Sequence, residues 1–201
     1  MSHSTIQIDA RHLAAAIHSA GRRDIRYYLN AVYIEASETE TRTTASDGYT
    51  CITLRSVRNV KTLWIGENIA LLVPRDTVEL VNKLTKGKGY VELRGTDNAW
   101  ELATPTARVP FVPIDGKFPD YRSIFPDKTS GEIAQYDPEL LMRFKKAAKA
   151  LGVKWNPDIA HNANGSGRVT LNGIDEFCGV IMPVRIAEKA RAAPNVSWVA
   201  C

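Results

Sequence analysis

The chain has 201 residues, of which 44% are hydrophobic and 24% are charged, a balance that excludes a disordered chain and is typical of a globular protein with one or two domains. Its formal net charge of +4 permits nucleic acid as a partner without requiring it. No apolar run reaches the length of a membrane span, and the three cysteines lack metal-type spacing. We therefore expect a cytoplasmic protein with reduced thiols and no membrane association.

The first half of the chain begins with a strand, a helix and further strands. A strand is predicted at residues 5–8, and Asp9 is placed to cap a helix that we expect to end at Gly21. Alternating apolar and polar residues then predict strands through residues 31–57, on both sides of the turn dipeptide Asp47-Gly48. The helix is expected to present a stripe of small and basic residues, which comprises Arg11, Ala15, His18 and Arg22.

The same order of elements then recurs. A strand at residues 69–73 precedes a helix at residues 77–86, which two glycines end. We expect Leu80, Val81 and Leu84 to face inward, with Arg75, Lys83 and Lys86 outside. The predicted strands that complete this unit lie at residues 90–94, 100–104 and 107–112. A unit of strand, helix and strands is thus repeated within residues 1–125, and such a repeat is informative about the fold.

The segment of residues 118–126 is predicted to join two parts of similar architecture. Pro119 and Pro126 fix φ and bias the preceding residues toward extended geometry. Because bulky apolar side chains lie between them, this joint differs from a solvated Gly/Ser linker and should pack along a surface. A second apolar stretch, residues 180–186, closes this part of the chain, and we expect the two stretches to meet and form a groove.

The clearest helix signal in the sequence follows the joint. A strand is predicted at residues 132–136, after which Asp137, Pro138 and Glu139 supply an N-cap, a proline at N1 and an acidic first turn. The helix is expected to end at Gly152. Residues 154–167 are predicted to be a loop, and the closing strands are expected at residues 169–171 and 177–186. The polar face of this helix is strongly basic, with Arg143, Lys145, Lys146 and Lys149.

The sequence contains no recognisable catalytic or metal-binding pattern. The four histidines are scattered, with no cysteine or carboxylate at ligand spacing. The glycine-rich segments do not match a phosphate loop, and no nucleophile elbow occurs. Asp47 is interpreted as a turn residue. We therefore expect a protein that is not an enzyme and needs no cofactor or metal.

Five short segments, in order along the chain, carry a resemblance to a known family. These segments are Arg26-Tyr27-Tyr28-Leu29-Asn30, Ala45-Ser46-Asp47-Gly48, Val73-Pro74-Arg75, Gly116-Lys117-Phe118-Pro119-Asp120-Tyr121-Arg122 and Val180-Ile181-Met182-Pro183-Val184-Arg185-Ile186. Over residues 4–186 the chain resembles the bacterial sliding clamp, the β subunit of DNA polymerase III, in its middle domain and part of its last domain. The resemblance implies an α+β DNA-clamp fold of repeated helix-plus-antiparallel-sheet units. One full clamp domain (1–117), an interdomain joint (118–126), an abbreviated clamp domain (127–186) and a C-terminal extension (187–201) are expected.

The resemblance also implies partners and sites. Family clamps are processivity factors that encircle duplex DNA and receive short linear peptides of DNA polymerase and clamp-loader subunits in an apolar cleft. Diffuse attraction to phosphates would suit a ring that slides. The residues expected to contact DNA are Arg11, Arg22, Arg23, Arg26, Tyr27, Tyr28, Lys83, Lys86, Arg143, Lys145, Lys146 and Lys149. The residues expected to form the peptide-binding cleft are Leu29, Ser46, Gly48, Tyr49, Thr50, Cys51, Pro119, Ser123, Ile124, Val180, Ile181, Met182, Pro183, Val184 and Arg185.

The chain also departs from the family pattern. The family usually has Thr-Asp-Gly-His-Arg-Leu where residues 46–51 here read Ser-Asp-Gly-Tyr-Thr-Cys, which changes the predicted cleft. No segment matches the family's first domain, so a closed ring would be a homo-oligomer of three or more copies. The alternative is a non-encircling adaptor or decoy that binds host replication proteins. Trp198 and Val199 in the extension are candidates to occupy a cleft, either of the same chain or of a neighbour.

Overall fold

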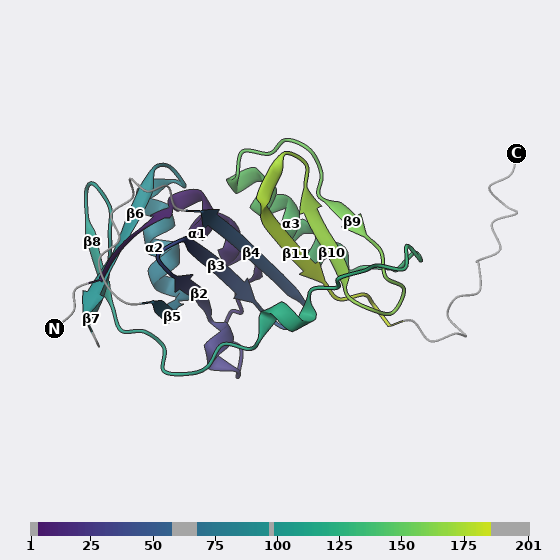
Figure 1. The fold of residues 1–201 in the computed structure, drawn as a ribbon, viewed down its shortest axis with the longest axis horizontal. Helices are drawn as coiled ribbons and strands as arrows, with labels where there is room; N and C mark the ends of the chain where they lie inside the picture. The colour runs from purple at the N-terminus through teal and green to yellow at the C-terminus, as the bar shows by residue number, and fades with distance from the viewer. Residues whose placement is uncertain (1–3, 58–67, 97–98, 186–201) are drawn as a thin grey trace, which may run out of the picture.

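The computed structural model describes residues 4–57, 68–96 and 99–185 (Figure 1). The predicted C-terminal extension at residues 187–201 and the last residue of the predicted final strand lie outside these ranges. Within the described ranges, no helix is long and apolar enough to cross a membrane.

Two consecutive units share the order strand, helix, three strands, as the repeat in the sequence predicts. The first unit comprises β1 (Ser4–Asp9), α1 (Ala10–Ala16), β2 (Ala31–Ala36), β3 (Glu40–Ser46) and β4 (Thr50–Val57). The second unit comprises β5 (Ile69–Pro74), α2 (Arg75–Thr85), β6 (Tyr90–Thr96), β7 (Ala99–Ala103) and β8 (Arg108–Phe111). The units exchange their first strands, because β1 pairs with β6 and β5 pairs with β2. This exchange ties the two units into one body.

A third, shorter unit extends one of the two sheets. It comprises α3 (Pro138–Ala150), β9 (Asp158–Ala160), β10 (Gly167–Leu171) and β11 (Ile174–Ile181). β11 pairs antiparallel with β4, with Val180 opposite Cys51. The sheets therefore have the strand orders β1-β6-β7-β8 and β5-β2-β3-β4-β11-β10-β9. This arrangement of helices and antiparallel sheets confirms the predicted fold class.

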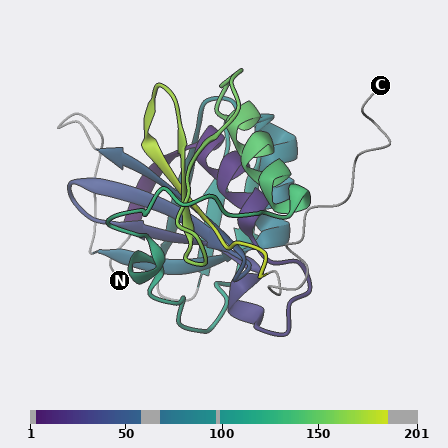
Figure 2. The same cartoon turned by 90° about the vertical axis from the view of Figure 1, so that its right-hand side faces the viewer.

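The α-helices α1, α2 and α3 lie on one side of the molecule, and the strands lie on the other (Figure 2). α1 packs against both α2 and α3, so it lies between them. One apolar core, which includes Ile6, Leu13, Ile52 and Phe144, continues from the first two units into the third. Three 3₁₀ helices, η1 (Ile17–Ser19), η2 (Tyr27–Leu29) and η3 (Tyr121–Ile124), shape the connections.

Several predictions about the helices were wrong. Asp9 does cap the first helix by accepting a hydrogen bond from the Arg11 N–H, but α1 ends at Ala16 and continues as η1, so Gly21 does not terminate it. Ala15 is fully buried and interrupts the expected stripe of small and basic residues, of which Arg11 and Arg22 are exposed. In α2 the buried residues are Val78 and Val81, whereas Leu80 and Leu84 are 46% and 41% exposed. The buried face of α2 is therefore narrower than its apolar pattern predicts.

The third unit also differs from its prediction in two places. Residues 132–136 form no strand, because their backbone makes isolated hydrogen bonds instead of a ladder, among them that from the Val184 N–H to the Gln135 carbonyl, 2.8 Å long. Residues 158–160, predicted as loop, form the edge strand β9 against β10. β11 ends at Ile181, before Pro183, since proline has no N–H for a ladder.

Candidate functional site

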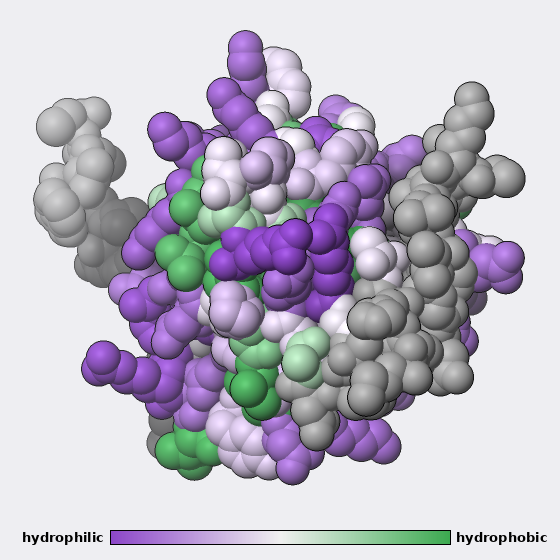
Figure 3. All heavy atoms as spheres, turned by 90° about the vertical axis from the view of Figure 1, so that its left-hand side faces the viewer, coloured by the Kyte–Doolittle hydropathy of each residue, from purple (hydrophilic) through white to green (hydrophobic). Residues whose placement is uncertain are grey.

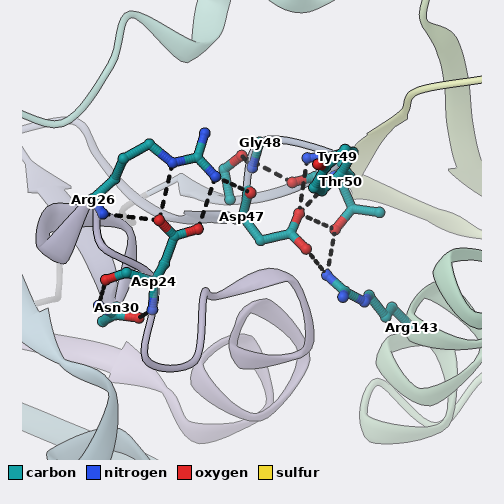
Figure 4. Close-up of polar contacts among 9 residues, drawn as sticks. Asp24, Arg26, Asn30, Asp47, Gly48, Tyr49, Thr50 and Arg143 are labelled. Atoms are coloured by element: carbon teal, nitrogen blue, oxygen red, sulfur yellow. Dashed lines mark hydrogen bonds and ion pairs between the residues drawn. The ribbon is translucent and has the colours of Figure 1, made fainter.

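Asp47, in the turn between β3 and β4, connects the first unit to α3 (Figure 4). One carboxylate oxygen accepts hydrogen bonds from the N–H groups of Tyr49 (3.0 Å) and Thr50 (2.8 Å) and from the Thr50 hydroxyl (3.1 Å). The other oxygen forms an ion pair with Arg143 of α3. Asp47 is therefore a turn residue, as predicted, and also holds the basic helix in place.

The loop before η2 packs against the same turn. Arg26 donates hydrogen bonds to both carboxylate oxygens of Asp24 and to the carbonyl of Asp47 (Figure 4). The Arg26 guanidinium lowers the pKa of Asp24 to about 2. Gly48 has φ +88°, and a Cβ built there would lie 2.7 Å from Arg26 Nη1. Both the backbone conformation and the close approach of Arg26 therefore favour glycine.

The joint and the end of β11 belong to one buried apolar cluster, as the sequence predicts. Phe118 and Tyr121 of the joint and Val180 of β11 lie in the same cluster as Leu29 and Cys51. Two contacts position the joint. The Phe118 ring stacks on Tyr33 with centroids 4.9 Å apart, and the Tyr121 hydroxyl donates to Glu35 at 2.6 Å. The Met182 N–H donates to the Tyr49 carbonyl at 2.9 Å, so the residues after β11 remain beside the β3–β4 turn.

Burial divides the predicted cleft residues into two groups. The buried group, which a peptide cannot reach from outside, comprises Leu29, Ser46, Thr50, Cys51, Val180 and Ile181. The accessible group, at least partly exposed, comprises Gly48, Tyr49, Pro119, Ser123, Ile124, Met182, Pro183, Val184 and Arg185. Tyr49 is 61% exposed and Met182 is 37% exposed. Burial raises the pKa of the Cys51 thiol, so Cys51 is an apolar support for the accessible group.

The predicted DNA-contacting residues also divide into two groups. Those with a protein partner are Arg11 (to Asp9), Arg22 (to Glu79), Arg26 (to Asp24), Arg143 (to Asp47) and Lys145 (to Asn156). Five of the predicted residues are exposed and have neither a hydrogen-bond nor an ion-pair partner among the described side chains, namely Arg23, Lys83, Lys86, Lys146 and Lys149. Of the two tyrosines, Tyr27 is exposed and Tyr28 is half-buried, with the rings packed edge to face.

His18 of η1 lies close to positively charged residues of α2 and α3. Burial, and then the positive charges of Lys146 and Arg75, lower the pKa of His18 to about 4. Arg75 itself, expected on the outer face of α2, is largely buried and donates to the carbonyls of Ile17 and Ala20 at 3.1 and 2.7 Å. The prediction for Arg75 was therefore wrong, and Arg75 instead ties α2 to the end of η1.

The geometry can be compared with known proteins. A family model described as DNA polymerase III beta subunit, central domain, matches residues 7–120. The chain belongs to this family. It is 28% identical to the beta sliding clamp of Proteus mirabilis over 163 residues, which cover 79% of this chain and 42% of that relative. With the beta sliding clamp of Escherichia coli strain K12 it shares 25% identity over 170 residues, covering 83% and 44%.

Solved sliding clamps share the fold. A crystal structure of the DNA polymerase sliding clamp from Pseudomonas aeruginosa superposes with a TM-score of 0.70 at 18% identity, covering 92% of this chain and 68% of that one. The DNA polymerase III beta subunit from Thermotoga maritima gives a TM-score of 0.71 at 13% identity, covering 93% and 67%. The chain thus spans less than half the length of these curated sliding-clamp relatives.

Sequence reasoning missed three interactions that position the site. Glu35 accepts from both Tyr121 and Arg122 of the joint, and the Ser166 hydroxyl donates to the Ile124 carbonyl at 3.1 Å. Lys145 holds the loop at residues 154–156 through two carbonyls and the Asn156 side chain. The partners in these interactions are distant in the sequence or belong to the backbone, so no local pattern marks them.

Proposed function

We propose that the chain is a DNA polymerase processivity factor without catalytic activity, which tracks along or encircles duplex DNA and receives partner peptides at the accessible cleft. Its membership in the sliding clamp family supports the general role. The proposed contact with DNA is supported by four exposed lysines without a hydrogen-bond or ion-pair partner in the described part of the chain. They are Lys83 and Lys86 at the end of α2 and Lys146 and Lys149 on α3. Mobile lysines without carboxylate partners attract phosphates without reading bases.

The proposal assigns different roles to the two groups of basic residues. Unpartnered lysines release counterions directly when they approach phosphate, whereas Arg26 and Arg143 would first have to leave Asp24 and Asp47. The former group would supply the attraction, and the latter would hold the loop and helix that display it. The exposed ring of Tyr27 provides a surface on which an exposed base could stack.

Reversing the charge of Lys146 and Lys149 is expected to weaken duplex DNA binding about tenfold or more in low salt. The slope of log affinity against log salt should fall by about 0.9 for each phosphate that is no longer neutralised, or about 1.8 for both lysines. Fluorescence anisotropy over a salt series measures both quantities. The Arg55→Glu/Arg108→Glu variant is the control for net charge, because both arginines are exposed on strands and not on the helices. Each arginine also pairs with a glutamate, Glu40 or Glu101, so the stability of this variant is measured beside its affinity.

Equal loss of affinity in the two variants would contradict a specific role for the helices. Ring closure is tested in a separate experiment, which compares retention on circular and linear duplexes and measures the mass of the assembled particle. We expect a homo-oligomer retained on circles and lost from linear ends. A chain that binds no DNA but still binds partner peptides would be a non-encircling adaptor.

The proposed division at residues 1–117, 118–126 and 127–186 makes the first two units the full clamp domain.

We also propose that the accessible cleft binds short apolar peptides of the polymerase and clamp loader. Met182, Val184, Ile124 and Tyr49 present partly exposed apolar surface above a buried cluster. A flexible methionine adapts to varied apolar side chains, and a firmly packed support lowers the cost of ordering the site.

Met182→Ala is expected to weaken binding of a fluorescent peptide containing leucine and phenylalanine by about tenfold, as for a central apolar contact. Val112→Ala, at an exposed residue after β8, should leave the dissociation constant unchanged. Equal affinity of the Met182→Ala variant and the unmodified chain would argue against this location for the peptide.

A further inference from the structure

An apolar hollow lies between α3 and β9, and we call it the α3 groove. It has a volume of about 310 Å³ and is lined by Pro138, Leu141, Met142 and Lys145 of α3 with Pro157 and Ile159. The four α3 residues share one side of the helix, since they are three or four residues apart. Arg143, which pairs with Asp47 of the first unit, and the fully buried Ala147 are four residues apart on another side of the helix. The groove is therefore on a different side of α3 from its contact with the first unit.

In the other two units, the strand that follows the helix is paired on both edges. The strand that follows the helix is β2 in the first unit, β6 in the second and β9 in the third. β2 is covered by β5, and β6 is covered by β1. The outer edge of β9 pairs with no strand in the described ranges. On the groove side of α3, Met142 is 51% exposed. By comparison with the other units, the third lacks a cover at the β9 edge.

The groove is well formed without an occupant. The Lys145 ammonium donates to the carbonyls of Lys154 and Trp155 and, at 2.8 Å, to Asn156. These three bonds hold the loop that borders the groove against α3. Phe144, which is 1% exposed, forms its floor with Val169. A rigid apolar hollow with these dimensions admits one large aromatic side chain, and pre-formation lowers the cost of binding.

The last described residues of the chain lie close to the start of α3. The Val184 N–H donates to the Gln135 carbonyl at 2.8 Å, and Gln135 is three residues before Pro138 at the start of the groove. The chain thus leaves the described residues beside the beginning of α3. Residues 186–201 include Trp198 in the sequence Val-Ser-Trp-Val, whose composition favours a strand. Twelve residues lie between Arg185 and Trp198, and the thirteen steps from one to the other can span about 40 Å, so the reach is ample.

We propose that residues 186–201 fold back onto the same chain, with the Trp198 side chain in the α3 groove and the neighbouring backbone along the open edge of β9. Strand addition at an edge supplies main-chain hydrogen bonds, and one pocket for a side chain sets the register. A covered edge also no longer offers a template for aggregation. Because the segment is tethered, its effective concentration at the groove is about millimolar.

The opposite end of the molecule is a poorer candidate for such docking. Figure 3 shows that polar side chains cover much of this end, and its apolar side chains form small separate groups. The edge strand β8 carries Pro110, which has no N–H for a new ladder. Ion pairs join Arg94 to Glu92 and Arg108 to Glu101 nearby.

Disulfide trapping in the full chain tests the proposal, because Cys201 ends the segment. Met142→Cys places a thiol at the groove, and Val112→Cys places one at a 73% exposed position after β8. Under oxidised glutathione, we expect an intramolecular bond between residues 142 and 201 to form about fivefold faster, or more, than one between residues 112 and 201. Adding Trp198→Ala should remove most of this difference. Peptide mapping by mass spectrometry identifies the pairs and separates them from those of Cys178.

Equal rates at the two positions, or bonds only between different molecules, would overturn the proposal; the second result would make the occupant another copy. Trp198 fluorescence gives a check that needs no new cysteine. The difference spectrum between the unmodified chain and Trp198→Ala should be blue-shifted and protected from acrylamide. A red-shifted, fully quenched difference spectrum would also contradict docking in the groove.

Discussion

Replacing Phe144 by alanine is expected to lower the free energy of unfolding by about 3–5 kcal/mol, the usual cost of truncating a buried aromatic side chain. Phe144 is 1% exposed and lies directly on the backbone of β11. A Cβ built at Gly179 would be only 2.5 Å from Phe144 Cε1. The ring fills the space over Gly179, which has no side chain to replace it, so a cavity should remain when the ring is removed.

Urea unfolding followed by circular dichroism measures this loss. Met142→Ala is the matched control, because Met142 lies on the same helix but is half-exposed, and it should cost less than about 1 kcal/mol. Phe144→Leu retains much of the volume and should fall between the two. Similar midpoints for Phe144→Ala and Met142→Ala would show that α3 is not held through this ring.

The expected effect links packing to the proposed DNA contact. Phe144 fastens α3 to β11, and β11 continues the sheet of the first unit through β4. Lys146 and Lys149 are displayed on this same helix. In Phe144→Ala, amides of α3 and β11 should therefore lose hydrogen-exchange protection before those of β1 and β6, since local opening follows the weakened packing.

Local chemistry allowed much of the fold to be predicted. The Asp137 cap with Pro138 at N1 identified α3 because a cap and a proline act on adjacent backbone groups. The Asp47-Gly48 turn was recognisable for the same reason. The exposure of Leu80 was not predictable, because an apolar stripe shows which residues share a side of a helix but not how wide the covering surface is. The prediction of a loop at residues 158–160 was wrong because a strand of three residues forms only through its pairing with β10, which the local sequence does not show.

The candidate site was less predictable than the fold. The order of the short segments identified the joint and the end of β11 as neighbours. It could not separate buried Cys51 from exposed Tyr49, since the difference depends on packing by Phe118 and Val180. The basic residues show the same limit. Arg143 and Lys146 are both basic residues on the polar face of the same predicted helix. Only Arg143 faces Asp47, which is 96 residues away in the sequence.

Asp47→Ala is expected to be the second most damaging substitution, at about 2–4 kcal/mol. Asp47 is 8% exposed, and its carboxylate accepts three hydrogen bonds within the turn and pairs with Arg143. Each hydrogen bond that is removed costs about 0.5–1.5 kcal/mol, and the guanidinium is left without its counter-charge. Asp47→Asn keeps an oxygen for the turn N–H groups but removes the charge, so it should cost less, about 1–2 kcal/mol.

A double-mutant cycle with Arg143→Met separates the turn from the ion pair. If the pair holds α3, Asp47→Ala should cost about 1–2 kcal/mol less in the Arg143→Met background, because that part of the penalty has already been incurred. The remaining cost reports on the bonds to Tyr49 and Thr50 and should appear as reduced protection of the Thr50 amide. Strictly additive costs would mean that Asp47 stabilises only its own turn. In that case the position of the basic helix would depend on Phe144 and not on charge.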